Sequence, residues 1–364
     1  MPAPTFDLRA PAIQPPTGHR ATPSDEFAAG QKERRLRRYQ PGDEAGILSL
    51  FRTVFGKERS LAYWQWQFRD NPAGQQILLA VTDGGEIVGQ CAGIPVSVAI
   101  GNRTYAFSQM VDQMVHPRFR KGLKRPGLQL ALFLGFFREF MGPGRGDMVY
   151  GFPIPEYERL IARLARTLVL HPVTGLVREL SEGSEGSVAK TSHWRYRISR
   201  VDRFDRSVDR LWERCRPNLP LAVIRDARYL NWRYADCPDG CYTLLLATDR
   251  WTGAPEGLAV LRQGLLEAPD APFTLLMDWL VPAESSTLAR ALLAQCHSVA
   301  VAAGRPRVRA WFPEYAREYR LLQQLGYCRE PTMYNLTANF FNDEITVEWA
   351  RSHWYYTMGD SDIF

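Results

Sequence analysis

The chain has 364 residues, 45% of them apolar, and a formal charge of +6 at neutral pH. This length allows two or three globular domains, and the modest positive charge favours anionic partners without identifying one. No apolar run approaches the roughly 20 residues that span a bilayer, and the first twenty residues lack the apolar core of a signal peptide. We therefore expect a cytoplasmic protein whose scattered cysteines stay reduced.

Two breaks in composition divide the chain. Residues 1–32 are rich in Pro, Ala and small polar residues and lack periodicity, which is typical of a disordered tail. The stretch SEGSEGSVAKTS opens a Gly/Ser/Glu-rich linker, which we place at 181–194. The remaining stretches, 33–180 and 195–340, each have the length of an ordinary domain, and 341–364 follow as a C-terminal extension.

The two long stretches share a repeated pattern. YWQWQFRDNP begins at Tyr63 and YLNWRYADCP begins at Tyr229, and FPIPEY at 152–157 is echoed by FPEY at 312–315. Two echoes in the same order predict a duplicated domain. The alternative, coincidence between Trp-rich helices, is disfavoured because the flanking strand pattern repeats too. We interpret Trp64, Trp66 and Trp232 as core residues of helices packed on a sheet.

The elements expected in chain order repeat as well. Each half opens with a strand, at 36–40 or 198–204, and an amphipathic helix, at 42–56 or 207–215. The short Trp-bearing helix and consecutive strands follow, with glycine turns as hairpin signals. In the first half we expect strands at 76–82, 87–100, 104–116, 147–153 and 167–173, and helices at 128–138 and 156–165. This order predicts an α+β domain with a mixed sheet.

A basic loop interrupts this pattern. VHPRFRKGLKRPGLQLAL starts at Val115, carries five basic side chains and no acid, and runs into an apolar helix. The N-terminus of a helix presents unpaired N–H groups and the positive end of the helix dipole, and both favour phosphate. Gly127, just before the helix, would let the backbone approach a pyrophosphate closely. The alternative is a solvated basic turn.

Two motifs make the chain similar to the GNAT acyltransferase superfamily. VHPRFR resembles the family's V-x-P-x-Y/F-R/Q entry into its pyrophosphate loop, and YRLLQQLGY at 319–327 resembles the helix and Leu-Gly-Phe/Tyr turn that close a GNAT domain. The resemblance covers about residues 33–340 as two tandem copies. It implies an α+β (α/β three-layer) fold in which each GNAT-like half is a mixed, mostly antiparallel twisted sheet flanked by helices.

The resemblance also implies that acetyl-CoA or another acyl-CoA binds at the basic loop. In place of the family's R/Q-x-x-G-x-G/A, the glycines here fall two and seven residues after Arg120, so the loop is longer than usual. The residues expected to contact the coenzyme are Met114, Val115, Arg120, Lys121, Gly122, Lys124, Arg125, Gly127 and Leu128.

The second half differs at the matching place. DWLVPAESSTL, from Asp278 to Leu288, has neither glycine nor basic residue, and it carries Glu284 where a pyrophosphate would lie. A carboxylate there would repel the ligand. We therefore expect the second copy to have lost acyl-CoA binding and to serve as a support or as a wall on the acceptor side.

Two residues are candidates for catalysis. Asp112 precedes the loop on its strand, where alternation places it between Met110 and Met114, and a carboxylate among methionines has the raised pKa that suits a general base. Asp278 occupies the equivalent position, so pairing of both carboxylates with arginines is an equal alternative. Tyr157 starts a helix where the family places a tyrosine that protonates the leaving thiolate; its echo Tyr315 favours a packing role.

The C-terminal extension gives two further expectations. The alternation at 344–349 predicts one more strand. The aromatic patch HWYY at 353–356 reads first as an anchor that docks the extension onto the two halves. Contact of Asp360 and Asp362 with a cationic or sugar acceptor is the alternative.

Taken together, the sequence predicts an acyl-CoA-dependent N-acyltransferase. It would move an acyl group, with acetyl the first expectation, to a primary amine of a small molecule or amino sugar by direct attack in a ternary complex. No metal-ligand pattern is present, so we expect no metal cofactor. One alternative is a degenerate, non-catalytic GNAT pair that binds or scaffolds. Another is an aminoacyl-tRNA-dependent transferase of related fold, although nucleic acid is disfavoured because the charge is concentrated in one loop.

Overall fold

The computed structural model describes residues 34–120, 127–180, 194–240, 242–264 and 272–363. The predicted tail and nearly all of the predicted linker lie outside these ranges. Within them, none of the helices is both long and apolar enough to cross a bilayer. We call residues 34–180 the first half, 194–340 the second half and 341–363 the C-terminal extension.

The first half alternates strands and helices much as the sequence predicts. Its elements are β1 (Arg34–Arg38), α2 (Glu44–Phe55), α3 (Leu61–Trp64), the π-helical turn η1 (Gln65–Arg69), β2 (Gln76–Thr82), β3 (Ile87–Ile100), β4 (Arg103–Val115), the 3-10 turn η2 (Pro117–Phe119), α4 (Leu128–Phe140), β5 (Met148–Gly151), α5 (Pro155–Ala165) and β6 (Leu168–Glu179). Gly85 and Gly101 have positive φ angles in the hairpins that join β2, β3 and β4, as expected of tight turns.

The second half repeats this order. Its elements are β7 (Tyr196–Val201), α7 (Val208–Cys215), η3 (Arg216–Asn218), β8 (Leu221–Val223), α8 (Ala227–Leu230), the π-helical turn η4 (Asn231–Ala235), β9 (Tyr242–Asp249), β10 (Pro255–Gln263), β11 (Phe273–Leu280), α9 (Ser286–Ala302), β12 (Arg307–Trp311), α10 (Arg317–Gln324) and β13 (Cys328–Phe340). The extension adds α11 (Val347–His353), β14 (Trp354–Tyr355) and η5 (Met358–Asp360).

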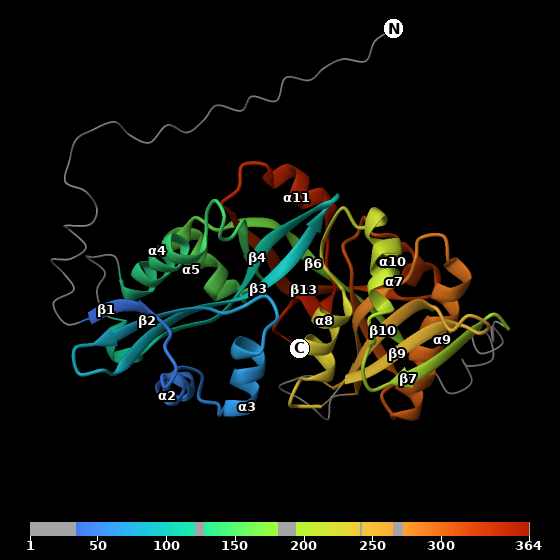
Figure 1. Ribbon diagram of the computed structural model, residues 1–364, viewed down its shortest axis with the longest axis horizontal. Coiled ribbons are helices and arrows are strands. Elements are labelled where there is room, and N and C mark those ends of the chain that lie inside the picture. The colour runs from blue at the N-terminus through green and yellow to red at the C-terminus, as the bar shows by residue number, and fades with distance from the viewer. Residues whose placement is uncertain (1–33, 121–126, 181–193, 241, 265–271, 364) are drawn as a thin grey trace, which may run out of the picture.

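The strands form one continuous mixed sheet in which the halves exchange their last strands. The main strand order is β1-β2-β3-β4-β5-β13-β6-β12-β11-β10-β9-β7. β13, the last strand of the second half, pairs with β5 of the first half, while β6 pairs with β12 of the second. These exchanged strands pair with each other at the middle of the molecule (Figure 1). The boundaries proposed at 33–180 and 195–340 therefore stay a prediction about folding units.

The Trp-bearing segments meet at the centre of this arrangement. Trp66 and Trp232 are both buried, and their rings stack at a centroid distance of 5.9 Å. Each indole donates a hydrogen bond to the other residue's backbone carbonyl, Trp66 Nε1 at 2.5 Å and Trp232 Nε1 at 2.7 Å. The two copies of the repeat thus contact each other symmetrically, and the core role predicted for these tryptophans is confirmed.

Helices cover both faces of the first half's strands. Figure 1 shows α4 and α5 on one face and α2 and α3 on the other. Leu132 and Phe136 of α4 pack on one set of β2 and β3 side chains, whereas Ile47 and Leu50 of α2 join the core on the opposite face. The strands of the first half are therefore the middle of three layers.

One predicted element is wrong. The alternation at 344–349 was expected to form a strand, but residues 347–353 form α11. The Thr346 hydroxyl accepts a hydrogen bond from the Trp349 backbone N–H and caps the helix, and this local cap outweighs the alternating pattern.

Candidate active site

A cavity opens where two neighbouring strands separate. β4 pairs with β5 in parallel only at residues 107–109, although β4 continues to Val115. Beyond that point lies a cavity of about 280 Å³. Its wall is mostly apolar, with Phe133 and Phe137 from α4, Phe55 from α2, and Ile154 after β5. Because α2 and α4 cover opposite faces of the sheet, the cavity is lined from both sides of it.

A β-bulge shapes the cavity's β4 wall. Gln90 pairs with Met114 while Ala92 pairs with Val111, so β4 has one residue more than β3 over this interval. Asp112 lies in the bulge with a φ of 49°, a left-handed conformation that is strained for a residue other than glycine. The bulge breaks the alternation, so the predicted common face for Met110 and Met114 is wrong.

Asp112 is paired with an arginine that the sequence analysis did not select. Both Asp112 carboxylate oxygens accept hydrogen bonds from Arg59, one of them at 3.1 Å. The Arg59 guanidinium also lies 3.9 Å from the ring centroid of Phe51. The side chains of Arg59 and Asp112 are only 14% and 8% exposed. The repeated sequence pattern could have identified this arginine, because Arg59 precedes Tyr63 by the same interval as Arg225 precedes Tyr229.

Tyr157 also lines the cavity, from the first turn of α5. Burial raises the pKa of its hydroxyl well above the usual value of 10, so the group stays protonated at neutral pH. The amide of Gln129 lies 3.5 Å from the hydroxyl oxygen. Its echo Tyr315 has a different environment, since its hydroxyl donates to the Trp354 carbonyl at 2.5 Å.

The N-terminus of α4 is open for an anion. Gly127 precedes the helix, and among the described residues no side chain caps it and no atom would lie within 4 Å of a Cβ added to Gly127. Met114, Val115 and Leu128 are buried, which leaves mainly their backbone groups for a ligand. Arg120 Nε donates to the Val115 carbonyl at 2.8 Å. The other predicted contacts, Lys121, Gly122, Lys124 and Arg125, lie outside the described residues.

The C-terminal extension also reaches the cavity. Asp362 lines it, and one carboxylate oxygen accepts a hydrogen bond from Gln109 Nε2 at 2.9 Å. Asp362 is exposed as a residue, but desolvation of its carboxylate by neighbouring groups raises its pKa to about 6, and the negative charge of Asp112 adds to the rise. The cavity thus brings Asp112, Tyr157 and Asp362 together from three separate parts of the chain.

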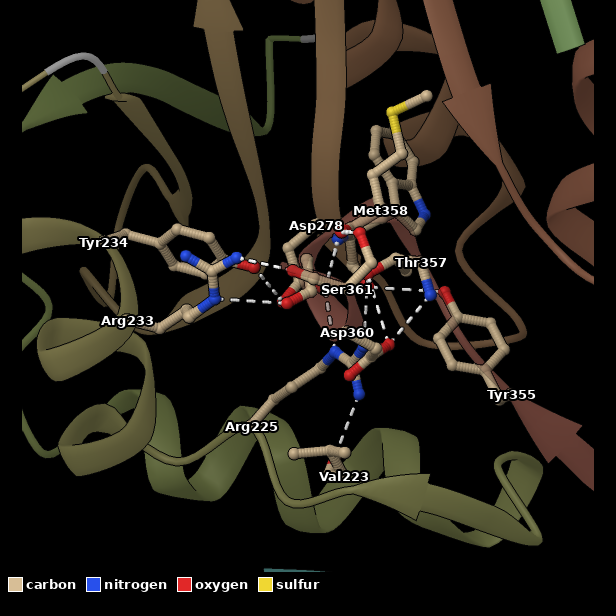
Figure 2. Close-up of polar contacts among 12 residues, drawn as sticks. Val223, Arg225, Arg233, Tyr234, Asp278, Tyr355, Thr357, Met358, Asp360 and Ser361 are labelled. Atoms are coloured by element: carbon tan, nitrogen blue, oxygen red, sulfur yellow. Dashed lines mark hydrogen bonds and ion pairs between the residues drawn. The ribbon is translucent and has the colours of Figure 1, made fainter. Parts of the chain in front are cut away.

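The equivalent place in the second half is closed by the same extension (Figure 2). Arg225 Nε contacts Asp278 at 2.7 Å, and its Nη2 contacts Asp360 at 2.7 Å. The pairs Arg59–Asp112 and Arg225–Asp278 have the same sequence separation of 53 residues. However, Arg225 and Asp278 are fully buried, and Tyr234 donates to the second Asp278 oxygen at 2.8 Å. Within the described part of the chain, this Arg–Asp pair therefore offers no exposed surface to a ligand.

Comparisons with known proteins bear on the class of protein. Residues 35–127 match the model of the acetyltransferase (GNAT) domain. A search of curated proteins found no relative of this sequence. The chain therefore contains a GNAT acetyltransferase domain within its first half.

Solved structures with the same fold cover most of the chain. A conserved protein of unknown function from Enterococcus faecalis V583, a probable N-acyltransferase, has a TM-score of 0.61 at 12% identity, over 88% of this chain and 74% of that one. A GCN5-related N-acetyltransferase from Kribbella flavida gives 0.56 at 15%, over 84% and 71%. Saccharomyces cerevisiae N-myristoyltransferase with bound myristoyl-CoA gives 0.54 at 11%, over 85% and 79%. The α+β, double-GNAT fold expected from the sequence is confirmed.

Proposed function

We propose that the protein is an acyl-CoA-dependent N-acyltransferase whose first half carries the reaction. It transfers an acyl group, acetyl being our first expectation, to a primary amine of a small molecule or amino sugar by direct attack in a ternary complex. The observation that carries the proposal is the cavity between β4 and β5. Residues of the matched range 35–127 form part of its wall, and Asp112, Tyr157 and Asp362 line it.

The coenzyme side of the site rests on α4. The uncapped N-terminus of this helix and the basic residues before it supply N–H donors and positive charge for a pyrophosphate. The apolar cavity beyond it has room for the thioester end of the same molecule. The residues present therefore fit an acyl-CoA.

The reacting groups would divide the proton transfers between them. The Tyr157 hydroxyl lines the cavity and carries a proton at neutral pH, so it is our candidate donor to the departing thiolate. Its raised pKa makes this hydroxyl a weaker acid than that of free tyrosine. Asp112, the other carboxylate of the cavity, has both oxygens engaged by Arg59, and the same pairing recurs in the closed second half. These contacts favour a positioning role for Asp112 and a supporting role for the second half.

Isothermal titration with acetyl-CoA and longer acyl-CoAs tests the proposal. Wild type is expected to bind, and a Lys121→Gln/Lys124→Gln/Arg125→Gln variant is expected to lose about tenfold or more in affinity, because charge-assisted hydrogen bonds contribute about 1.5–3 kcal/mol each. The matched control, Arg197→Gln/Arg200→Gln/Arg228→Gln, removes three exposed charges from the second half. No binding by wild type would contradict the enzyme proposal, and equal binding by the two variants would contradict the loop assignment.

A glycine variant tests the helix N-terminus separately. Gly127 has a φ of −66°, and no atom of the described residues lies within 4 Å of its missing Cβ, so Gly127→Ala should fold normally. If a pyrophosphate approaches this backbone, the added methyl group lowers acyl-CoA affinity. Gly84→Ala in the β2–β3 turn, where the nearest atom lies at 3.9 Å, is the control. Unchanged affinity in Gly127→Ala would argue against phosphate binding at this N-terminus.

A further inference from the structure

The C-terminal extension carries two aspartates to two equivalent places, with opposite outcomes. Asp360 contacts Arg225 of the buried Arg225–Asp278 pair, and its carboxylate also accepts from the Thr357 backbone N–H at 2.8 Å. Asp362, two residues further, reaches the cavity beside the Arg59–Asp112 pair. The Asp360 carboxylate is therefore fully engaged in buried contacts, whereas the Asp362 carboxylate lies at a cavity that a substrate can enter.

The extension is held firmly enough to place Asp362. Arg233, buried in η4, donates to the carbonyls of Gly359 at 3.1 Å and Ser361 at 3.0 Å. Trp354 and Tyr355 form β14, which pairs with β8. These contacts fix the backbone on both sides of η5. The hydrogen bond from Gln109 Nε2 to the carboxylate then places the Asp362 side chain, which is itself exposed.

We propose that Asp362 is the general base of the acyl transfer, supplied to the first half's cavity by the C-terminal extension. This inference rests on the proposed function. The Asp362 carboxylate accepts one proton from the attacking amine nitrogen as the C–N bond forms, the C–S bond breaks, and the thiolate takes a proton from Tyr157. No oxidant, reductant or metal enters this balance.

The environment of Asp362 suits the task better than that of Asp112. Asp362 is held by the neutral amide of Gln109, and within the described part of the chain no ion pair involves it. The ionisable and charged groups that share its two cavities are Asp112, Arg233, Tyr63, Tyr150, Tyr157 and Tyr229, and the charge of Arg59 also acts on it. Asp362 as a residue is exposed, while desolvation of its carboxylate by neighbouring groups and the charge of Asp112 raise its pKa to about 6, and Arg59 opposes the rise. A base with this pKa is deprotonated at neutral pH and still accepts a proton readily.

The test uses the full chain and a primary amine that wild type acylates, chosen from a panel of small amines and amino sugars. Asp362→Asn keeps the shape of the side chain and removes its basicity. We expect kcat/KM at pH 7.5 to fall 10²- to 10⁴-fold, and the acid limb near pH 6 to disappear from the pH profile. Titrated acetyl-CoA should bind with unchanged affinity. Asp343→Asn, exposed in the same extension, should leave rate and profile unchanged.

Each outcome separates this inference from the proposed function. Wild type that binds no acyl-CoA overturns the proposed function itself. Wild type that binds acyl-CoA but acylates no amine overturns the assignment of a base and leaves the coenzyme site standing. Turnover by Asp362→Asn at the wild-type rate, with the acid limb retained, overturns the role of Asp362 alone.

Discussion

At the scale of single residues, the duplicated Arg–Asp pairs show how one motif takes two roles. Arg225–Asp278 is sealed from solvent, with a second carboxylate from Asp360 and a hydroxyl from Tyr234. Arg59–Asp112 lies at the edge of a cavity and remains partly accessible. The same side chains are thus a fixed core element in one half and a part of the site wall in the other.

This contrast predicts unequal costs for matched substitutions. Asp278→Asn removes one of the two negative charges that balance the buried Arg225 guanidinium. It should lower the free energy of unfolding by about 3 kcal/mol or more. Asp112→Asn, at the less completely buried pair, should cost less than Asp278→Asn, about 1–2 kcal/mol. Urea unfolding at pH 7 measures both. Equal costs would show that burial does not set the energetics of the two pairs.

The raised pKa of Asp362 predicts that Asp362→Asn stabilises the protein at high pH. Its folded-state pKa of about 6 lies above the unfolded value of about 3.9, so the folded state binds the proton more tightly. The resulting stabilisation is present at pH 4 and is lost as the pH rises through 6. Asp362→Asn should therefore be more stable than wild type at pH 8, by about 1 kcal/mol after allowance for solvent screening.

The measurement is Tm at pH 4 and pH 8 for both proteins. The Tm advantage of Asp362→Asn should shrink or vanish at pH 4. Asp343→Asn serves again as the control. A lower Tm for Asp362→Asn at pH 8 would identify Asp362 as a structural residue, which is contrary to a functional carboxylate kept at a cost in stability.

At the scale of elements, the paired π-helical turns join the two copies of the repeat. Trp66→Phe and Trp232→Phe each remove an indole donor and leave the partner's buried carbonyl unpaired, so each should cost about 1–3 kcal/mol. Because the rings stack, the double variant should deviate from additivity by about 0.5 kcal/mol or more. Chemical unfolding of the four proteins in this cycle gives the coupling, and strict additivity would contradict a direct interaction.

The packing of the C-terminal extension requires a glycine at position 359. A Cβ on Gly359 would lie 1.9 Å from the Tyr234 hydroxyl and 2.9 Å from the Met277 carbonyl. Gly359→Ala should therefore displace η5 from Tyr234 and β11 and lower the free energy of unfolding by about 1–3 kcal/mol. It should also reduce acyl transfer, since Asp362 follows three residues later. Gly84→Ala is the control. Urea unfolding and the amine acylation assay together check this, and wild-type stability in Gly359→Ala would contradict the packing described here.

Local pattern predicted most elements, because periodicity and turn residues act over a few positions. β2 and β3 have the bounds expected from alternation between glycine turns. Other features depend on contacts that are distant in sequence. The bulge at Asp112 is supported by Arg59, and Asp362 reaches the cavity only because the extension crosses both halves. The repeat alone identifies Asp112 and Asp278 as equivalent, but not which of them a ligand can reach.

At the scale of the whole molecule, the strand exchange unites the two halves. Each of β6 and β13 pairs with the penultimate strand of the other half, and they also pair with each other. The segment β8 of the second half adds to the end of β3 in the first, and β14 adds to β8. Unfolding of either half would therefore unpair strands that belong to the other half.

This interlocking predicts one cooperative unfolding transition. Far-UV circular dichroism and tryptophan fluorescence should give coincident thermal curves, because the sheet and the aromatic core belong to both halves. Asp278→Asn, a change in the second half, should lower the single Tm. Saturating acetyl-CoA, bound to the first half under our proposal, should raise it in wild type and in Asp278→Asn alike. Two resolved transitions, with acetyl-CoA shifting only one of them, would instead show that the halves are independent folding units despite the shared sheet.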